Sequence, residues 1–106
     1  MPQVVLKNVS REKAAQLAPG VAKAVADIIN VPIEHIVVEH SDTEFFRGGV
    51  KDSRSAMVWI YWKKRTAELQ RQVADALSIV LKGAGYLPVE IVYSNLDMDD
   101  FYEYKD

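Results

Sequence analysis

The sequence has no cysteine among its 106 residues. That absence excludes disulfides, thiolate metal sites and cysteine nucleophiles together. Glycine and proline are also sparse, at five and four residues, so no long repetitive or disordered stretch is indicated. No apolar run is long enough for a transmembrane helix, and the first residues lack the pattern of a secretory signal. We therefore expect a cytoplasmic protein of a single domain, with no membrane partner.

An excess of basic charge is absent too, because the formal net charge is −2. A protein that binds nucleic acid needs a basic face to neutralise phosphates. The only dense basic run is Lys63-Lys64-Arg65, which is typical of solvated charges where a strand turns into a helix. The charge pattern therefore predicts no nucleic-acid partner.

Residues 2–40 follow a strand, helix, strand order. Val4 to Leu6 predict a short strand, and a helix follows from its cap at Ser10 to Asn30. Apolar residues recur along this helix every three or four positions: Ala14, Leu17, Val21, Val25 and Ile28. Pro19 interrupts that stripe and predicts a kink or a short break. After Pro32, residues 33–39 predict a second strand.

Residues 55–95 repeat this order. Residues 56–62, Ala-Met-Val-Trp-Ile-Tyr-Trp, predict a strand with apolar side chains on both faces. A helix then begins at Thr66 and ends at Lys82-Gly83, and residues 87–93 predict the fourth strand. A polar segment over 40–55 joins the two repeats, and residues 96–106 form a C-terminal tail.

Two βαβ units of this kind predict an α/β (α+β) fold with two helices on one face of a four-stranded mixed sheet. Two parallel pairs of strands meet in the middle of that sheet. Because the strand over 56–62 is apolar in both directions, we expect the face without helices to meet another subunit. The alternative is that Tyr61 or Trp62 merely shields a sheet edge.

A Met1-Pro2 start, the paired βαβ plan, Asn30-Val31-Pro32 and a turn over Phe45–Gly49 occur together in this chain. The segment from Ile91 to Met98 follows near the end. This combination resembles the tautomerase superfamily, which includes 4-oxalocrotonate tautomerase and macrophage migration inhibitory factor, and in particular a small bacterial branch with fused repeats. The resemblance implies a homotrimer in which three sheets line a central barrel and the helices lie outside.

The same resemblance implies that Pro2 is the catalytic residue. Removal of Met1 would leave Pro2 with a free secondary amine, and burial lowers the pKa of an amine from its ordinary value of about 7.7 to 8. In the superfamily this neutral base moves a proton between an enol and the carbon next to a carbonyl, without metal or organic cofactor. The residues alone also allow a simpler interpretation, in which Pro2 only starts a strand.

The arginines that bind a substrate carboxylate in the superfamily have no counterpart here, because their positions fall on Val37 and Val9. If the first strand runs antiparallel to the strand over 56–62, Trp62 and Lys63 come close to Pro2. Lys63 would then polarise a carbonyl or hold a carboxylate, and Trp62 would wall the pocket.

The turn over Phe45–Gly49 supplies two further candidates. Arg47, with Phe46 beside it, would reach the Pro2 pocket from the same subunit or from a neighbouring one. Arg11 is a weaker candidate for the same role. His35 and Glu39 share one strand face, but two ligands without a third do not predict a metal site.

Two functions stay open on the sequence. The first is an isomerase that catalyses keto-enol proton transfer on a small keto or enol acid with Pro2 as general base. The second is a non-catalytic trimeric binding or scaffold protein with a vestigial pocket. In both, the aromatic tail over 96–106 is predicted to pack along a neighbouring subunit.

Overall fold

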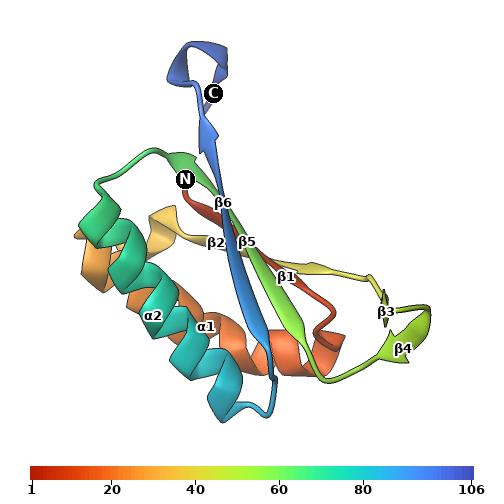
Figure 1. Cartoon of the computed structure of the whole chain (residues 1–106). Helices are drawn as coiled ribbons and strands as arrows, with labels where there is room; N and C mark the ends of the chain where they lie inside the picture. The colour runs from red at the N-terminus through yellow and green to blue at the C-terminus, as the bar shows by residue number, and fades with distance from the viewer.

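Four strands form one mixed sheet in the computed structural model, which describes all 106 residues (Figure 1). They are β1 (Gln3–Lys7), β2 (Val37–Ser41), β5 (Ala56–Lys63) and β6 (Val89–Leu96), in the order β2-β1-β5-β6. β1 and β2 are parallel, as are β5 and β6, and the two pairs meet through the antiparallel neighbours β1 and β5. The predicted fold class and the predicted pairing of the strands are confirmed.

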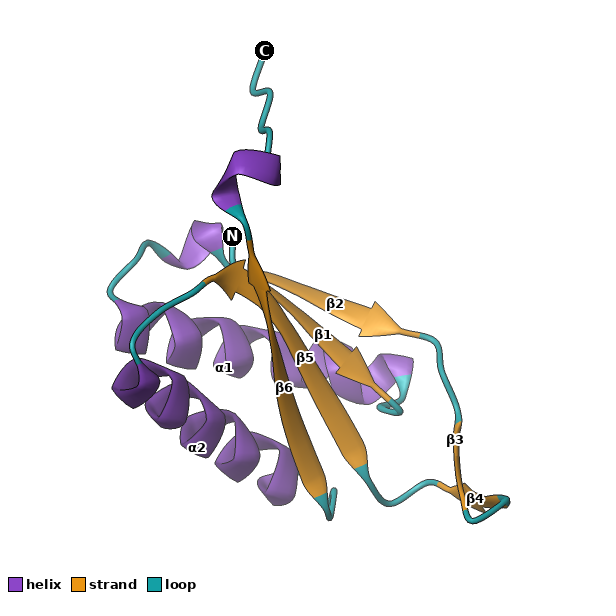
Figure 2. Cartoon of the chain, turned by 45° about the horizontal axis from the view of Figure 1, so that its top comes forward, coloured by secondary structure: helices purple, strands orange, loops and turns teal.

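Two helices, α1 (Arg11–Ile29) and α2 (Ala67–Gly83), cover one face of this sheet (Figure 2). Strand residues of one parity face them, since side chains alternate along a strand. The core joins these residues to the apolar stripes of both helices, and its fully buried members include Val4, Leu6, Val58, Ile60, Val21, Val25, Val73, Leu77 and Leu81. This single apolar layer holds the two repeats together.

The predicted helix starts are confirmed by their caps. Ser10 Oγ accepts a hydrogen bond from the Lys13 amide at 3.2 Å, and Thr66 Oγ1 accepts one from the Leu69 amide at 3.2 Å. Asn30 ends α1 in the left-handed conformation, with φ of 58°.

Helix α1 continues without interruption through Pro19, so the predicted break is wrong. Pro19 is exposed, and the carbonyl that its missing amide leaves free can therefore bond water. The buried residues on either side of it, Ala14 and Val21, pack on the same core and keep the two halves of the helix in line.

Three segment boundaries differ from the predictions. Residues Ile33–His35 form one turn of 3-10 helix, and β2 begins only at Val37. The last strand runs over Val89–Leu96 and not over 87–93. The segment over 40–55 contains a hairpin of two short strands, β3 (Phe45–Arg47) and β4 (Val50–Asp52). The sequence predicted a polar connection with a turn over Phe45–Gly49, but not these two strands.

The sheet face opposite the helices carries Met57, Trp59 and Tyr61 of β5, all partly buried, together with Val5 of β1. The Trp59 and Tyr61 rings stack with their centroids 6.2 Å apart. No helix of this chain covers this face, and neither helix is long and apolar enough to cross a membrane.

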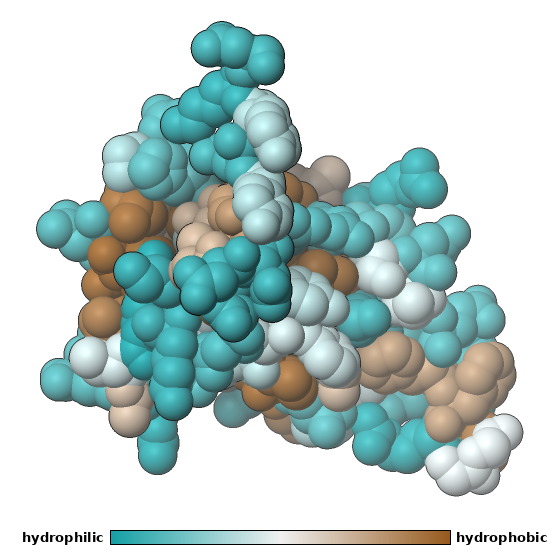
Figure 3. Space-filling view, turned by 90° about the horizontal axis from the view of Figure 1, so that it is seen from above, coloured by the Kyte–Doolittle hydropathy of each residue, from teal (hydrophilic) through white to brown (hydrophobic).

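Both chain termini lie at the same end of the sheet (Figure 1). Seen from that end, the surface is mostly hydrophilic and is interrupted by separate hydrophobic patches (Figure 3). Met1 and the exposed tyrosines of the tail, Tyr102 and Tyr104, belong to this end of the molecule.

Candidate active site

Pro2 is fully buried at the start of β1. Its carbonyl oxygen accepts a hydrogen bond from the Val37 amide at 3.0 Å, which ties it to β2. The Met1 amino group donates a hydrogen bond to the His35 carbonyl at 3.0 Å. The ring of Pro2 is thus held in place by the neighbouring strand. Its nitrogen is an amide, without basicity, as long as Met1 is attached.

Trp62 lies where the antiparallel arrangement predicted. Gln3 of β1 pairs with Tyr61 of β5, so the register continued by one residue sets Pro2 opposite Trp62. Trp62 is fully buried, its indole N–H donates to Asn95 Oδ1 at 3.1 Å, and its ring stacks on Tyr93 with centroids 4.6 Å apart. The indole therefore provides a rigid apolar wall at the strand position facing Pro2.

Arg65 is a residue that the sequence analysis missed. Its guanidinium lies over the Trp62 ring, 5.1 Å from the ring centroid, and donates a hydrogen bond to the Lys63 carbonyl at 2.9 Å. Arg65 is partly buried and has no carboxylate within ion-pairing distance, and this burial lowers its pKa. Arginine stays charged at neutral pH even so. An oriented, partly dehydrated cation without an acidic partner is suited to bind a carboxylate ligand.

One signal in the sequence marks this arginine. Arg65 directly precedes the N-cap Thr66 and follows Trp62 by three positions, which is close enough for the side chain to fold back over the ring. The charge pattern predicts that the whole run Lys63-Lys64-Arg65 is solvated. The structure separates its members, because both lysines are exposed while Arg65 packs on the indole.

Lys63 is the last residue of β5 and is exposed. Because side chains alternate along a strand, it leaves the sheet on the face opposite to that of Trp62. The chain by itself therefore brings Trp62 to the Pro2 side and directs the Lys63 side chain to the helix-free face.

Arg47 and Phe46 lie in the hairpin, at the opposite end of the sheet from Pro2 (Figure 2). Arg47 donates to Asp52 Oδ2 at 2.8 Å, to Ser55 Oγ at 3.3 Å and to Glu90 Oε1 at 3.5 Å. Phe46 is 61% exposed. Within one chain these two residues do not reach Pro2, so only a neighbouring subunit can bring them to its pocket.

A hollow of about 340 Å³ opens beside the start of the chain. Its lining comes from three segments, and consists of Met1, Glu34, His35, Val37, Glu103 and Lys105. Because Met1 forms part of its wall, loss of Met1 would enlarge the hollow on the side where Pro2 lies. No three His, Asp or Glu side chains in the chain lie close enough together to hold a metal ion.

These elements build the same fold as macrophage migration inhibitory factor-like proteins. The chain belongs to the DUF1904 family, described as a domain of unknown function, whose model matches residues 1–105. No curated protein matches the sequence.

Solved structures agree on this fold. A DUF1904 domain from Sebaldella termitidis ATCC 33386 is 24% identical, with a TM-score of 0.88 over 97% of this chain and 95% of that one. The macrophage migration inhibitory factor-like protein of Entamoeba histolytica is 15% identical, with a TM-score of 0.78 over 97% of this chain and 95% of its own.

A third structure is that of Pt0534 inactivated by 2-oxo-3-pentynoate, with 18% identity and a TM-score of 0.79 over 98% of this chain and 92% of that one. At these identities the likeness shows the fold alone. At that level it confirms the resemblance predicted from the sequence.

Proposed function

We propose that the protein is a cofactor-independent tautomerase that moves a proton within a small keto or enol acid, with Pro2 as general base after removal of Met1. One arrangement carries this proposal. A fully buried proline starts β1 opposite Trp62, and an arginine without an acidic partner is stacked on that same indole.

The chemistry follows from the properties of these groups. Burial of the Pro2 amine and the nearby Arg65 cation both favour its neutral form, so the nitrogen is able to accept a proton near neutral pH. It takes the proton from an enol hydroxyl or from the carbon next to a carbonyl, and returns it to the other position. Arg65 binds the substrate carboxylate and stabilises the enolate charge that develops between the two transfers.

Subunit neighbours complete the proposed site. The partly buried aromatic face of β5, which no helix covers, supports the homotrimer that the superfamily resemblance implies. Lys63 is proposed as a second cation for the pocket of a neighbouring subunit, because its side chain leaves the sheet on the helix-free face. Arg47 and Phe46 enter only from a neighbouring subunit, and Arg47 is the weaker anchor because its guanidinium already has three side-chain partners. A cytoplasmic location belongs to the same proposal.

Replacement of the base tests this function. Wild type and Pro2→Ala are compared on the ketonisation of phenylenolpyruvate and of 2-hydroxymuconate, after mass spectrometry has shown that Met1 is absent from both. We expect Pro2→Ala to lower kcat by about 10² or more, the range of general-base effects. Pro19→Ala, which replaces an exposed proline in α1, serves as the matched control and should keep the wild-type rate.

Chemical labelling provides a second test. We expect 2-oxo-3-pentynoate to add to the Pro2 nitrogen, with a mass increase equal to that of the reagent on the N-terminal peptide. An unchanged rate in Pro2→Ala would exclude the amine mechanism. A trimmed wild type that is inactive and unlabelled would favour the non-catalytic binding or scaffold protein instead.

A further inference from the structure

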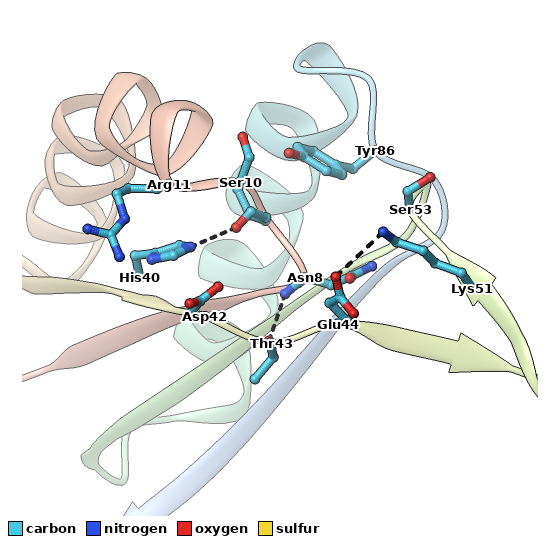
Figure 4. A pocket seen from close by; sticks show the side chains of 11 residues that line it. Asn8, Ser10, Arg11, His40, Asp42, Thr43, Glu44, Lys51, Ser53 and Tyr86 are labelled. Atoms are coloured by element: carbon cyan, nitrogen blue, oxygen red, sulfur yellow. Dashed lines mark hydrogen bonds and ion pairs between the residues drawn. The ribbon is translucent and has the colours of Figure 1, made fainter.

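A second cleft, of about 370 Å³, lies at the other end of β1 from Pro2 (Figure 4). It is bordered by the start of α1, the segment that follows β2, the hairpin strand β4 and the loop before β6. Segments far apart in the sequence thus meet around one polar hollow. Of the residues considered for the Pro2 pocket, only Arg11 lines this cleft. Arg11 begins α1, at the other end of β1 from Pro2, so within one chain it does not serve the Pro2 pocket.

The charges around this cleft are only partly paired. Lys51 Nζ lies 3.5 Å from Glu44 Oε1, so these two charges offset each other on one side of the cleft. Nε2 of His40 is engaged with the Val9 carbonyl at 3.0 Å. Arg11 and Asp42 have neither an ion pair nor a side-chain hydrogen bond. The cleft therefore presents one unpaired cation and one unpaired carboxylate.

Tyr86 offers a hydroxyl donor to the same cleft. The residue is only 9% exposed and lines the cleft, yet its hydroxyl has no hydrogen-bond partner in the chain. In Figure 4 this hydroxyl points toward Ser10 at the start of α1. The ring of Tyr86 is packed in the core, whereas its hydroxyl oxygen is not buried and is therefore open to a bound acceptor.

The start of α1 adds backbone donors at the same place. Ser10 caps only the Lys13 amide, and the Arg11 and Glu12 amides have no acceptor, as is general in the first turn of a helix. This end of the helix also carries a partial positive charge. Hydrogen-bond donors and positive charge thus come from Arg11, Tyr86 and the first turn of α1. Asp42 supplies the negative charge.

We propose that this cleft binds a small zwitterion, an α-amino carboxylate. Its carboxylate is held by Arg11, the Tyr86 hydroxyl and the first-turn amides of α1, and its ammonium group by Asp42. A ligand with one charge of each sign matches the two unpaired charges and leaves the Lys51–Glu44 pair intact. The site is separate from the Pro2 pocket, so it does not depend on the proposed catalysis.

Binding of free amino acids to the full chain tests the proposal. A panel of L-amino acids is screened by thermal denaturation, and those that raise Tm are measured by isothermal titration. We expect at least one to raise Tm with a dependence on its concentration. Its N-acetyl and its carboxamide derivatives should each bind about tenfold more weakly or worse, because each lacks one of the two charges.

Substitutions locate the ligand. Arg11→Gln and Asp42→Asn should each weaken binding about tenfold, and Tyr86→Phe, which keeps the packed ring, about fivefold. Arg71→Gln and Tyr102→Phe are matched controls at exposed positions away from the cleft and should bind like wild type. The proposal is wrong if no amino acid raises Tm, if both derivatives bind as tightly as the parent, or if all three cleft variants keep the wild-type affinity.

Discussion

At the hairpin end of the sheet Arg47 is bonded to three side chains, whereas at the Pro2 end Arg65 is bonded to none. The first arginine ties β4 to β6 and to Ser55, the residue before β5, and its charge is satisfied within the chain. The second is oriented by an aromatic ring and a backbone carbonyl, and its charge remains available. A ligand charge can therefore be bound at Arg65 without breaking an interaction that holds the fold.

The hairpin end has a second anchor in Asn8. Its Nδ2 donates to the carbonyls of Asp52 and Ser55 at 2.7 and 2.9 Å, and its Oδ1 accepts from the Phe45 amide at 3.1 Å. Asn8 also has a φ of 63°, which asparagine tolerates better than most residues. The side-chain amide of Asn8, which holds the hairpin, therefore has hydrogen-bond partners for both its nitrogen and its oxygen. The Pro2 end lacks such a network around its arginine.

Replacement of the free arginine should give the largest change in activity. We expect Arg65→Gln to lower kcat/KM by about 100-fold, since a charged hydrogen bond to the substrate is lost, and Arg65→Lys to restore part of it. Arg47→Gln should change kcat/KM by less than about threefold, because that charge serves the fold. Steady-state kinetics on one substrate measures all three. An equal loss of kcat/KM in both glutamine variants would contradict this difference between the two arginines. It would favour a Pro2 pocket to which a neighbouring subunit contributes Arg47.

Replacement of the hairpin anchor should give the largest change in stability. We expect Asn8→Ala to lower the free energy of unfolding by about 2–3 kcal/mol, through lost hydrogen bonds and a positive φ that alanine resists. Asn8→Gly loses the same bonds but tolerates the backbone conformation, so it should be about 1 kcal/mol less destabilising. Urea unfolding compares the two. Equal losses of unfolding free energy in the two variants would show that the positive φ at position 8 adds nothing to the destabilisation by alanine.

Tyr93 stacks on Trp62, so the ionisation of its hydroxyl reports on burial at the Pro2 end of the sheet. Burial raises the pKa of Tyr93 to about 12, and its hydroxyl donates to the Gln70 carbonyl at 2.6 Å. Since its pKa in the folded state exceeds the ordinary value, the contribution of Tyr93 to stability is full below pH of about 10 and is lost as pH rises toward 12.

Tyr93→Phe should therefore lower the free energy of unfolding at neutral pH by about 1 kcal/mol, through the lost hydrogen bond, and should flatten the alkaline decline. Urea unfolding at neutral and alkaline pH measures both effects. Parallel pH profiles of wild type and variant would contradict this assignment.

Asp52 should give the smallest effect, and only in acid. The hydrogen bond from Arg47, together with others from Ser55 and from the amides of Arg54 and Ser55, holds the pKa of Asp52 below its ordinary value. A depressed pKa stabilises the fold above the unfolded value near about 4, and the stabilisation is lost as pH falls below it. Asp52→Asn should consequently lose less stability than wild type between neutral pH and pH of about 3. A steeper loss in the variant would reverse the assigned direction.

The fold was predictable because local and long-range signals agree. Ser10 and Thr66 cap their helices as predicted, and the alternation along residues 56–62 corresponds to a strand buried on one face and partly buried on the other. The errors lie where these signals compete. Ile33 is apolar but follows Pro32 and is exposed, so periodicity alone extended the strand over a 3-10 turn.

The site was only half predictable. The position of Trp62 followed from strand pairing, which is a property of the whole sheet. Arg65 did not, because sequence periodicity does not say which member of a basic run folds back onto a ring. The hairpin was missed for a similar reason. Its strands have three residues each, and their apolar side chains Phe46 and Val50 are exposed. They are held by the side chain of Asn8, distant in sequence, and not by burial of an apolar face.

Titration of the Pro2 nitrogen tests the central claim most directly. Protein labelled with ¹⁵N-proline is treated with methionine aminopeptidase, and the chemical shift of the Pro2 nitrogen is followed against pH by NMR. We expect a single titration with a pKa below the ordinary range of about 7.7 to 8.0, and a pKa closer to that range in Arg65→Gln. Two results would contradict the role of Pro2 as a general base. In one, the nitrogen does not titrate because Met1 resists removal; in the other, the amine titrates with an ordinary or higher pKa.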